Sequence, residues 1–372
     1  MIISALKSKD ISDSRSPIHI DTVKALKSLA NKLMFEKDIG SGIYTNNKLF
    51  EKLGLESATR KKCLKESGII LTLQPLKDEE LNMIKEGSTI LGIIDPFNNI
   101  KFLKSCAQRN INVVSMEFIP RITRAQKMDV LSSQANLAGY VSVIESAKHL
   151  SSALPMMMTA AGTLKPAKVF IIGVGVAGLQ AIATAKRLGA KVEAFDTRSA
   201  AEEQVNSLGA KFIKIELGET GETEQGYAKE LTKKQIKMQK EIQSEVCSAS
   251  DIVITTAQVF GRPAPKIIDK FTISKMRPGS VIFDMAVESG GNVEGSIKDK
   301  IVIKNGVKII GISNLASKVS SNASFALSNN FNNWILDFFD EANDRINFDF
   351  DDEIISNSVL VYHGKITNER FK

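Results

Sequence analysis

Three glycines at a fixed spacing are the residues of this chain best suited to chemistry with a bound ligand. Gly173, Gly175 and Gly178 form the pattern G-x-G-x-x-G between an apolar run and a helical pattern. The first glycine permits a tight turn, the second lets the backbone approach a pyrophosphate, and the third allows close packing of helix and strand. The positive end of the helix faces the phosphates. The pattern therefore indicates a dinucleotide site.

A carboxylate follows at the distance at which such a site binds the adenosine ribose. Asp196 ends the next apolar run, KVEAFD. A carboxylate there accepts hydrogen bonds from the ribose hydroxyls and repels a 2′-phosphate, so we expect NAD(H) rather than NADP(H). Arg198 lies two residues further on. An arginine there is able to bind the 2′-phosphate, but we expect it to pair locally or to pack beside the adenine.

Groups that move protons are scarce, although a dehydrogenase acting on an alcohol or amine needs one. The chain has three histidines, none of them in the nucleotide-binding stretch: His19, His149 and His363. Hydride transfer between two nicotinamides changes no O–H or N–H bond. It requires only that the rings be held about 3–3.5 Å apart and that water be excluded. A second nicotinamide is therefore the expected hydride acceptor.

A polar cluster, PRITRAQKMDVLSSQ, lies near the expected domain junction. It contains Arg121, Gln126, Asp129 and Ser132. These side chains suit the binding of a carboxamide or ribose, and they equally suit an ordinary solvated helix start. The residues alone leave both interpretations open.

The elements that must position these residues form two α/β series. In the first 120 residues, short apolar runs alternate with amphipathic stretches, which predicts a parallel sheet covered on both faces. The predicted strands are NKLMFEKD, GIILTLQ, STILGIID and INVVSME. The predicted helices are DTVKALKSLA, DEELNMIKEG and NIKFLKSCAQRN.

A proline-free segment from Arg124 to Leu154 predicts one long helix, or two in line. The second series follows, with interleaved helices and the strands KVFIIGVG, KVEAFD, KFIKIEL, DIVITTA, SVIFDMAV and VKIIGIS. Six strands of this kind suit a doubly wound nucleotide-binding domain. After Asn314 the pattern turns helical, and we expect this tail to pack on the first domain.

The predicted fold class is therefore α/β, with two Rossmann-like parallel-sheet domains linked by a long helix. The second is the doubly wound dinucleotide-binding domain. We expect the first domain to be discontinuous, with residues 1–125 plus 318–372. Residues 126–317 then form the NAD(H)-binding domain, including the linking helix.

Composition argues against several other classes of function. The net charge is +7, but lysines and acids are mixed and aromatics make up only 6%, so we expect no nucleic-acid binding. No apolar run reaches the roughly 18 residues of a membrane span, and the start lacks a signal-peptide pattern, which predicts a cytoplasmic chain without direct membrane insertion. The three cysteines are far apart, which predicts reduced thiols and no metal site.

Longer stretches resemble a known family. RAQKMDVLSSQANLAGY, MMMTAAGTLKPAKVFIIGVGVAGLQAIATAKRLGA and AAEEQVNSLGAKF are similar to the NAD(H)-binding alpha component of proton-translocating NAD(P) transhydrogenases. GYAKELTKKQ, RPGSVIFDMAVESGGN and GVKIIGISNLAS extend the resemblance, which is dense from Arg121 to Ser317. Alanine dehydrogenases are more distantly similar.

The resemblance implies roles for particular residues. The loop that holds the nicotinamide end of the cofactor in this family matches Arg121, Gln126 and Asp129, with Ser132 beside them. A loop that closes over the cofactor with a tyrosine matches EQGYAKE, and hence Gly226, Tyr227 and Ala228. Further implied cofactor contacts are Val176, Asp196, Thr197, Arg198, Gln239 and Gln258.

The resemblance also implies an activity and an assembly. The activity is hydride transfer from NADH to NADP⁺ held on a separate NADP(H)-binding beta subunit. A membrane-spanning subunit couples this transfer to proton movement. The component itself is expected to be a homodimer, held at the cytoplasmic face of the inner membrane through these partner subunits.

The first 120 residues depart from the family pattern. Where relatives begin with a Lys-Glu and a Glu-Arg-Arg-like segment, this chain reads KSKDISDSRSPIHIDTV, and we assign no functional residue there. The main alternative is an alanine-dehydrogenase-like amino-acid dehydrogenase, which needs a Lys and a His in the first domain. GIILTLQPL lacks the Lys and GIIDPFNN lacks the His. A non-catalytic NAD(H)-sensing regulator is a third hypothesis, although no DNA-binding or effector module accompanies it.

Overall fold

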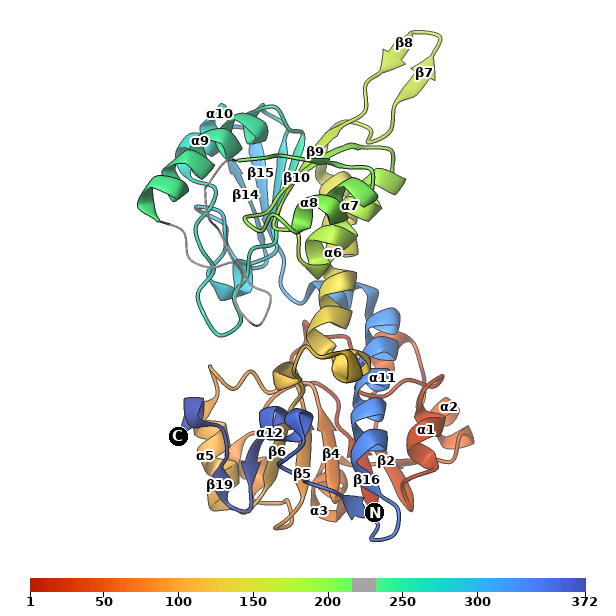
Figure 1. Cartoon of the computed structure of the whole chain (residues 1–372). Coiled ribbons are helices and arrows are strands. Elements are labelled where there is room, and N and C mark those ends of the chain that lie inside the picture. Colours follow the sequence, from red (N-terminus) through yellow and green to blue (C-terminus); the bar gives the residue numbers. More distant parts are fainter. Residues whose placement is uncertain (216–231) are drawn as a thin grey trace. The chain divides into compact units, whose positions relative to one another are not determined.

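The computed structural model describes residues 1–215 and 232–372, and the chain divides into two compact units (Figure 1). Unit 1 contains Met1–Gln134 and Ser317–Lys372, and unit 2 contains Ala135–Ala316. Each unit has its own sheet and its own apolar core. The two α/β sheets confirm the predicted fold class.

Unit 1 contains an eight-stranded sheet in the order β19-β18-β6-β5-β4-β1-β2-β3. Strands β1 to β6 run parallel, and β18 and β19 add antiparallel pairings at one edge. The strand bounds are β1 Ile2–Ala5, β2 Lys32–Glu36, β3 Glu56–Ala58, β4 Ile69–Thr72, β5 Thr89–Gly92, β6 Asn112–Ser115, β18 Val359–Tyr362 and β19 Lys365–Ile366. Because the strands are parallel, the loops after β1, β4, β5 and β6 leave the sheet at the same edge.

Helices cover this sheet on both faces (Figure 1). They are α1 Val23–Lys27, α2 Asn47–Lys52, α3 Arg60–Glu66, α4 Asp78–Leu81, α5 Ile100–Gln108, α11 Ser320–Phe338 and α12 Glu353–Ser358. The longest, α11, buries Leu327, Phe331 and Trp334 in one core with Phe35 of β2 and Leu71 of β4. These apolar residues of α11 recur every three or four positions, so one face of the helix meets the core.

The predicted long helix is interrupted. Thr123–Met128 form a 3₁₀ helix (η3), and the α-helix α6 spans Val130–His149. Asp129 separates the two, because its extended backbone ends the first and its carboxylate caps the second. The expected helical end at Leu154 is wrong. The chain instead enters an antiparallel hairpin with strands β7 Met157–Thr159 and β8 Gly162–Leu164.

Unit 2 contains a seven-stranded sheet in the order β11-β10-β9-β12-β13-β15-β14, parallel except for β14. The strands are β9 Lys168–Ile172, β10 Lys191–Phe195, β11 Lys211–Phe212, β12 Ile252–Thr255, β13 Val281–Asp284, β14 Lys300–Lys304 and β15 Val307–Gly311. The helices are α7 Val176–Arg187, α8 Ala201–Ser207, α9 Lys233–Ser248 and α10 Lys270–Lys275. From β9 the chain proceeds outward to β10 and β11, then returns to β12 on the other side of β9. The carboxyl ends of β9 and β12 therefore mark the topological switch point, where open α/β sheets bind ligands.

The hairpin β7–β8 extends away from the sheet of unit 2 (Figure 1). Every residue from Pro155 to Lys165 is exposed. Within residues 1–215 and 232–372, no helix combines the length and the apolar character of a membrane span.

Candidate functional site

The three fingerprint glycines lie at the switch point of unit 2, and they differ in what surrounds them. Gly173 has φ +97°, and a Cβ there would lie 2.5 Å from the Oγ1 of Thr256. A Cβ on Gly178 would lie 2.0 Å from the carbonyl oxygen of Gly173. Around Gly175, by contrast, the described residues place nothing within 4 Å of a Cβ. The fold therefore requires the first and third glycines, whereas the second leaves space beside the backbone.

This space lies at the start of α7. Gly175 is the residue before the helix, and within the described residues no side chain caps its first turn and no acid stands in that turn. Val176, the first helical residue, is exposed. The first N–H groups of α7 thus retain their capacity to bind an anion, which the helix dipole reinforces. A pyrophosphate fits these residues.

Asp196 follows β10, and its carboxylate is already occupied within the chain. Oδ2 accepts a hydrogen bond from the backbone N of Val174 at 2.7 Å. Arg198 donates from Nε to Oδ1 at 2.9 Å and from Nη2 to Oδ2 at 3.0 Å. The side chain of Asp196 is only 9% exposed. The expected local pairing of Arg198 is therefore present, and it offsets the negative charge on which our argument against a 2′-phosphate relied.

The remaining predicted contacts of unit 2 are dispersed. Thr197 is half-buried between Asp196 and Arg198. Gln239 lies on α9 and is half-buried. Gln258 is exposed after β12, where its Nε2 donates to the carbonyl oxygen of Met285 at 2.9 Å. Gly226, Tyr227 and Ala228 lie outside the described residues.

The predicted polar cluster belongs to unit 1 and follows β6. Arg121 and Gln126 are exposed. Asp129 and Ser132 contact each other directly, since Oδ1 of Asp129 accepts from the backbone N of Ser132 at 2.8 Å and Oδ2 accepts from its Oγ at 2.6 Å. Asp129 is thus the N-cap of α6. This role at the start of the helix is compatible with the predicted role in binding a carboxamide or ribose. We refer to residues 121–132 as the polar loop.

The polar loop is anchored by its apolar positions and by α11. Ala125 and Met128, three residues apart on one face of η3, enter the core that contains Phe331. Lys127 forms an ion pair with Asp337 of α11. The apolar side chains thus face inward while Gln126 remains exposed.

Sequence analysis missed a buried carboxylate just before the polar loop. Glu117 is 7% exposed and accepts hydrogen bonds from the backbone N of Ile94 and of Asp95, each at 2.7 Å, and from the Oγ of Ser115 at 2.6 Å. It thereby joins the loops after β5 and β6, and it holds Asp95 where that residue adopts a left-handed backbone with φ +47°. Burial raises the pKa of Glu117, although these hydrogen bonds act in the opposite direction. A lone glutamate among apolar residues gave no signal that distinguished it from a solvated one.

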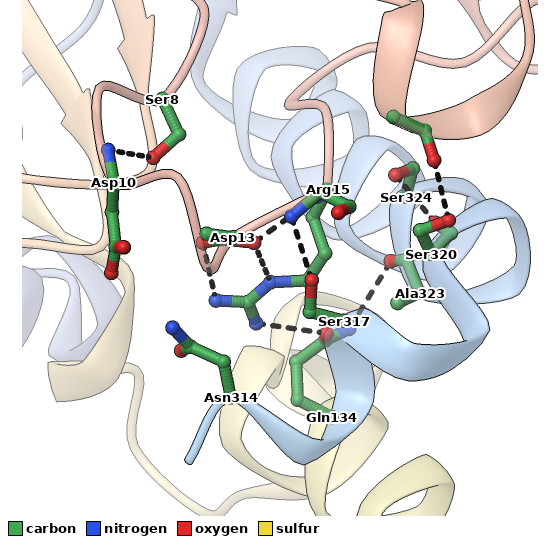
Figure 2. A network of polar contacts seen from close by, with 12 residues as sticks. Ser8, Asp10, Asp13, Arg15, Gln134, Asn314, Ser317, Ser320, Ala323 and Ser324 are labelled. Atoms are coloured by element: carbon green, nitrogen blue, oxygen red, sulfur yellow. Dashed lines mark hydrogen bonds and ion pairs between the residues drawn. The ribbon is translucent and has the colours of Figure 1, made fainter. Parts of the chain in front are cut away.

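A second polar network was also missed, in the divergent segment after β1. Figure 2 shows Arg15 between Asp13 and Gln134. Its Nε and Nη2 donate to the two carboxylate oxygens of Asp13 at 2.8 Å each, and Nη1 donates to Oε1 of Gln134 at 3.1 Å. The backbone N groups of Ser14 and Ser16 donate to Ser317 and Ser324 in the region where α11 begins. This network fixes the first turns of α6 and α11, and the run DSRS was its only trace in the sequence.

Two family models cover nearly the whole chain. The alanine dehydrogenase/PNT N-terminal domain matches residues 7–138, and the alanine dehydrogenase/PNT C-terminal domain matches residues 142–369. A curated relative from Rickettsia prowazekii, named as the first part of an NAD(P) transhydrogenase subunit alpha, is 42% identical over 99% of this chain and 96% of its own length.

Solved structures agree. The transhydrogenase of Sinorhizobium meliloti has a TM-score of 0.86 at 38% identity, with 100% of both chains covered. An L-alanine dehydrogenase has a TM-score of 0.83 at 19% identity, covering 100% of this chain and 98% of its own, which shows a shared fold. With both domain models matched in order and a transhydrogenase relative of 42% identity along its full length, the chain belongs to the alanine dehydrogenase/PNT family.

Proposed function

We propose that this chain is the NAD(H)-binding catalytic subunit of a proton-translocating NAD(P) transhydrogenase. It transfers a hydride from NADH to NADP⁺ bound on a separate subunit. The observation that carries the proposal is the open position at Gly175 beside the uncapped start of α7, at the switch point of unit 2. Identity of 42% to a transhydrogenase alpha subunit supports the choice of reaction.

In unit 2, the start of α7 would bind the pyrophosphate and Asp196 the adenosine ribose. Val176, Thr197, Arg198, Gln239 and Gln258 are the further proposed contacts. Arg198 already pairs with Asp196. The proposed preference for NAD(H) therefore requires that this ion pair stay intact, so that Arg198 does not bind a 2′-phosphate. Tyr227, with Gly226 and Ala228, is proposed as a lid from the family resemblance alone.

In unit 1, the polar loop would hold the nicotinamide end. Arg121 and Gln126 present exposed polar groups suited to a carboxamide, and Asp129 and Ser132 keep them at the start of α6. The bound dinucleotide supplies the hydride. The protein supplies orientation of the ring and exclusion of water, and transfer between two nicotinamides requires no acid or base from these residues.

An alanine-dehydrogenase-like activity is the second candidate, and the carboxyl ends of β1 and β4 disfavour it. Gln74, directly after β4, uses its Oε1 to accept bonds from the Oγ of Ser8 at 3.0 Å and from the backbone N of Lys9 at 3.1 Å. An amino-acid substrate would need a lysine and a histidine near this edge. The segments where they are expected, GIILTLQPL and GIIDPFNN, contain neither, and Lys9, which lies at this edge, is paired with Glu80 at 2.7 Å.

The proposed assembly is a homodimer that docks the NADP(H)-binding beta subunit and, through it, a membrane-spanning subunit. The hairpin β7–β8 supports self-association. A lone two-stranded hairpin is marginal in water, yet this one exposes Met158 to 82% and carries no charge from Pro155 to Leu164. A symmetric pair would bury the same arm of each copy. Attachment to the cytoplasmic face of the membrane would then come from the partners.

Mixing the chain with a purified, membrane-free NADP(H)-binding subunit tests the reaction. We expect NADPH to reduce an NAD analogue in the mixture and not with either component alone. Absence of transfer, combined with NADH-dependent amination of pyruvate by this chain alone, would replace the proposal with the alanine-dehydrogenase alternative.

A further inference from the structure

We infer that Asn330 of α11 is a positioning residue that sets the geometry of the polar loop toward the nicotinamide end of the dinucleotide. The inference rests on the proposed function, because it takes the polar loop as the nicotinamide-binding segment. No sequence motif marks this residue, which lies about 200 positions after the loop, in a segment outside the glycine fingerprint.

Asn330 joins the polar loop to the first turn of α6 through one amide. Its Nδ2 donates to the carbonyl oxygen of Lys127 in η3 at 2.9 Å. Its Oδ1 accepts from the Oγ of Ser133 in the first turn of α6 at 2.8 Å. Lys127 stands next to Gln126, and Ser133 stands next to Ser132. A displacement of Asn330 would therefore move Gln126 and Ser132, two of the residues proposed for the nicotinamide end.

The bridge lies in the core of unit 1, where packing restricts its movement. Asn330 is 6% exposed, and its neighbours Leu327, Phe331 and Trp334 on α11 are buried in the core of unit 1. Both polar ends of the amide are used, and a buried polar group left without its partner costs about 1–3 kcal/mol. The amide thus fixes the distance between η3 and α6 at the point where Asp129 interrupts the helical backbone.

Of the two neighbouring asparagines on α11, Asn332 provides a matched control. Asn333 donates to the same carbonyl oxygen of Lys127 at 3.0 Å, but within the described chain its side chain makes no bond to α6. Asn332 is 2% exposed and donates to the carbonyl oxygen of Thr22 at 2.9 Å, away from the polar loop. Asn332→Ala therefore removes a buried amide from the same helix without affecting the bridge.

The test compares binding of NADH with binding of ADP-ribose, which carries the adenosine and pyrophosphate but lacks the nicotinamide. For Asn330→Ala in the full chain we expect the Kd for NADH to rise about tenfold, the effect of losing one hydrogen bond to the nicotinamide when the loop is displaced, while the Kd for ADP-ribose is unchanged. Ser133→Ala, which removes the other end of the bridge, should act in the same direction with a smaller change. It also serves if Asn330→Ala does not fold.

Asn332→Ala should lower the melting temperature while leaving the ratio of the two Kd values unchanged. Gln126→Ala separates the inference from the function on which it rests. If Gln126→Ala alters the ratio and both bridge variants do not, the positioning role of Asn330 is wrong and the proposed function stands. If Gln126→Ala leaves the ratio unchanged, the proposed role of the polar loop in holding the nicotinamide is overturned together with the positioning role of Asn330, whereas the proposed reaction is decided by the transfer assay with the NADP(H)-binding subunit.

Discussion

Gly175 and Gly178 stand three residues apart, but only one of the two positions has room for a side chain. A methyl group on Gly178 would collide with backbone, whereas the described chain leaves the position beside Gly175 open. Folding therefore requires a glycine at position 178, whereas a glycine at position 175 is explained by a ligand that occupies the open space.

Replacement of each glycine by alanine separates these constraints. We expect Gly178→Ala to lower the free energy of unfolding by about 1–3 kcal/mol, because α7 must move away from β9. Gly175→Ala should leave the denaturant midpoint within error of the original and weaken NADH binding, since the methyl occupies the space proposed for the pyrophosphate. Unchanged NADH affinity in Gly175→Ala would contradict the proposed site.

Glu117 predicts a pH dependence. Because burial raises its folded pKa, the native state binds more protons than the unfolded state above the ordinary glutamate pKa, and the free energy of unfolding falls as pH rises through that window. Glu117→Gln retains an acceptor but cannot ionise. Urea denaturation at a series of pH values from mildly acidic to neutral gives the free energy of unfolding at each pH. The decrease of this free energy with rising pH should be smaller for this variant than for the original chain. The exposed Glu51→Gln serves as control, and an identical slope in Glu117→Gln would show that this carboxylate does not contribute.

At the scale of elements, the polar loop depends on one residue that ends η3 and begins α6. Asp129→Ala removes the N-cap and should lower the free energy of unfolding by about 1 kcal/mol. Asparagine caps a helix about as well as aspartate, so Asp129→Asn should keep that stability. If the carboxylate also serves the nicotinamide, Asp129→Asn will weaken NADH binding but not ADP-ribose binding. Equal affinity for NADH in the Asn variant would assign Asp129 to the helix alone.

The elements were predictable where their pattern was long. The strands that lead to the glycines and to Asp196 were found because each is a continuous apolar run before a turn. The three-residue β3 offered too few positions for a period to appear. β1 was missed although its apolar run is as long as that of the predicted β4. β14 was missed although Asn305-Gly306, both with positive φ, is the turn expected between antiparallel strands. Two helices in line were one of the two alternatives predicted for this segment, but the position of the break at Asp129 was not predicted, because no proline or glycine marks it.

The candidate site likewise contains features that were predictable from the sequence and features that were not. The glycine fingerprint was readable because its spacing is local, and the pairing of Arg198 with Asp196 was expected because the two residues are two positions apart. The hydrogen bond from the backbone N of Val174 to Asp196 appears only in three dimensions. Glu117 and Asn330 acquire their meaning from partners on other elements, and even Glu117 and Asp95 stand 22 positions apart. Local patterns cannot report such pairings.

At the scale of the whole molecule, the hairpin β7–β8 predicts an oligomeric state. The double variant Met157→Glu, Met158→Glu places a charge on each face of the hairpin, because neighbouring side chains of a strand point to opposite faces. Sedimentation should then detect monomers for this variant and the proposed dimers for the original chain. Ile11→Glu, at a fully exposed apolar residue of unit 1, is the control and should remain dimeric. A dimeric hairpin variant would exclude the hairpin as the interface.

The interleaving of the two units sets an order of assembly during synthesis. Unit 2 is continuous, whereas the core of unit 1 lacks α11 until the ribosome has passed residue 338. The nucleotide-binding unit is therefore complete while its companion still lacks a central helix. Trp334, the only tryptophan of the chain, lies on α11 and is fully buried. Its fluorescence thus reports the closing of unit 1 and is silent about unit 2, which gives a refolding experiment an optical signal for the later of the two events.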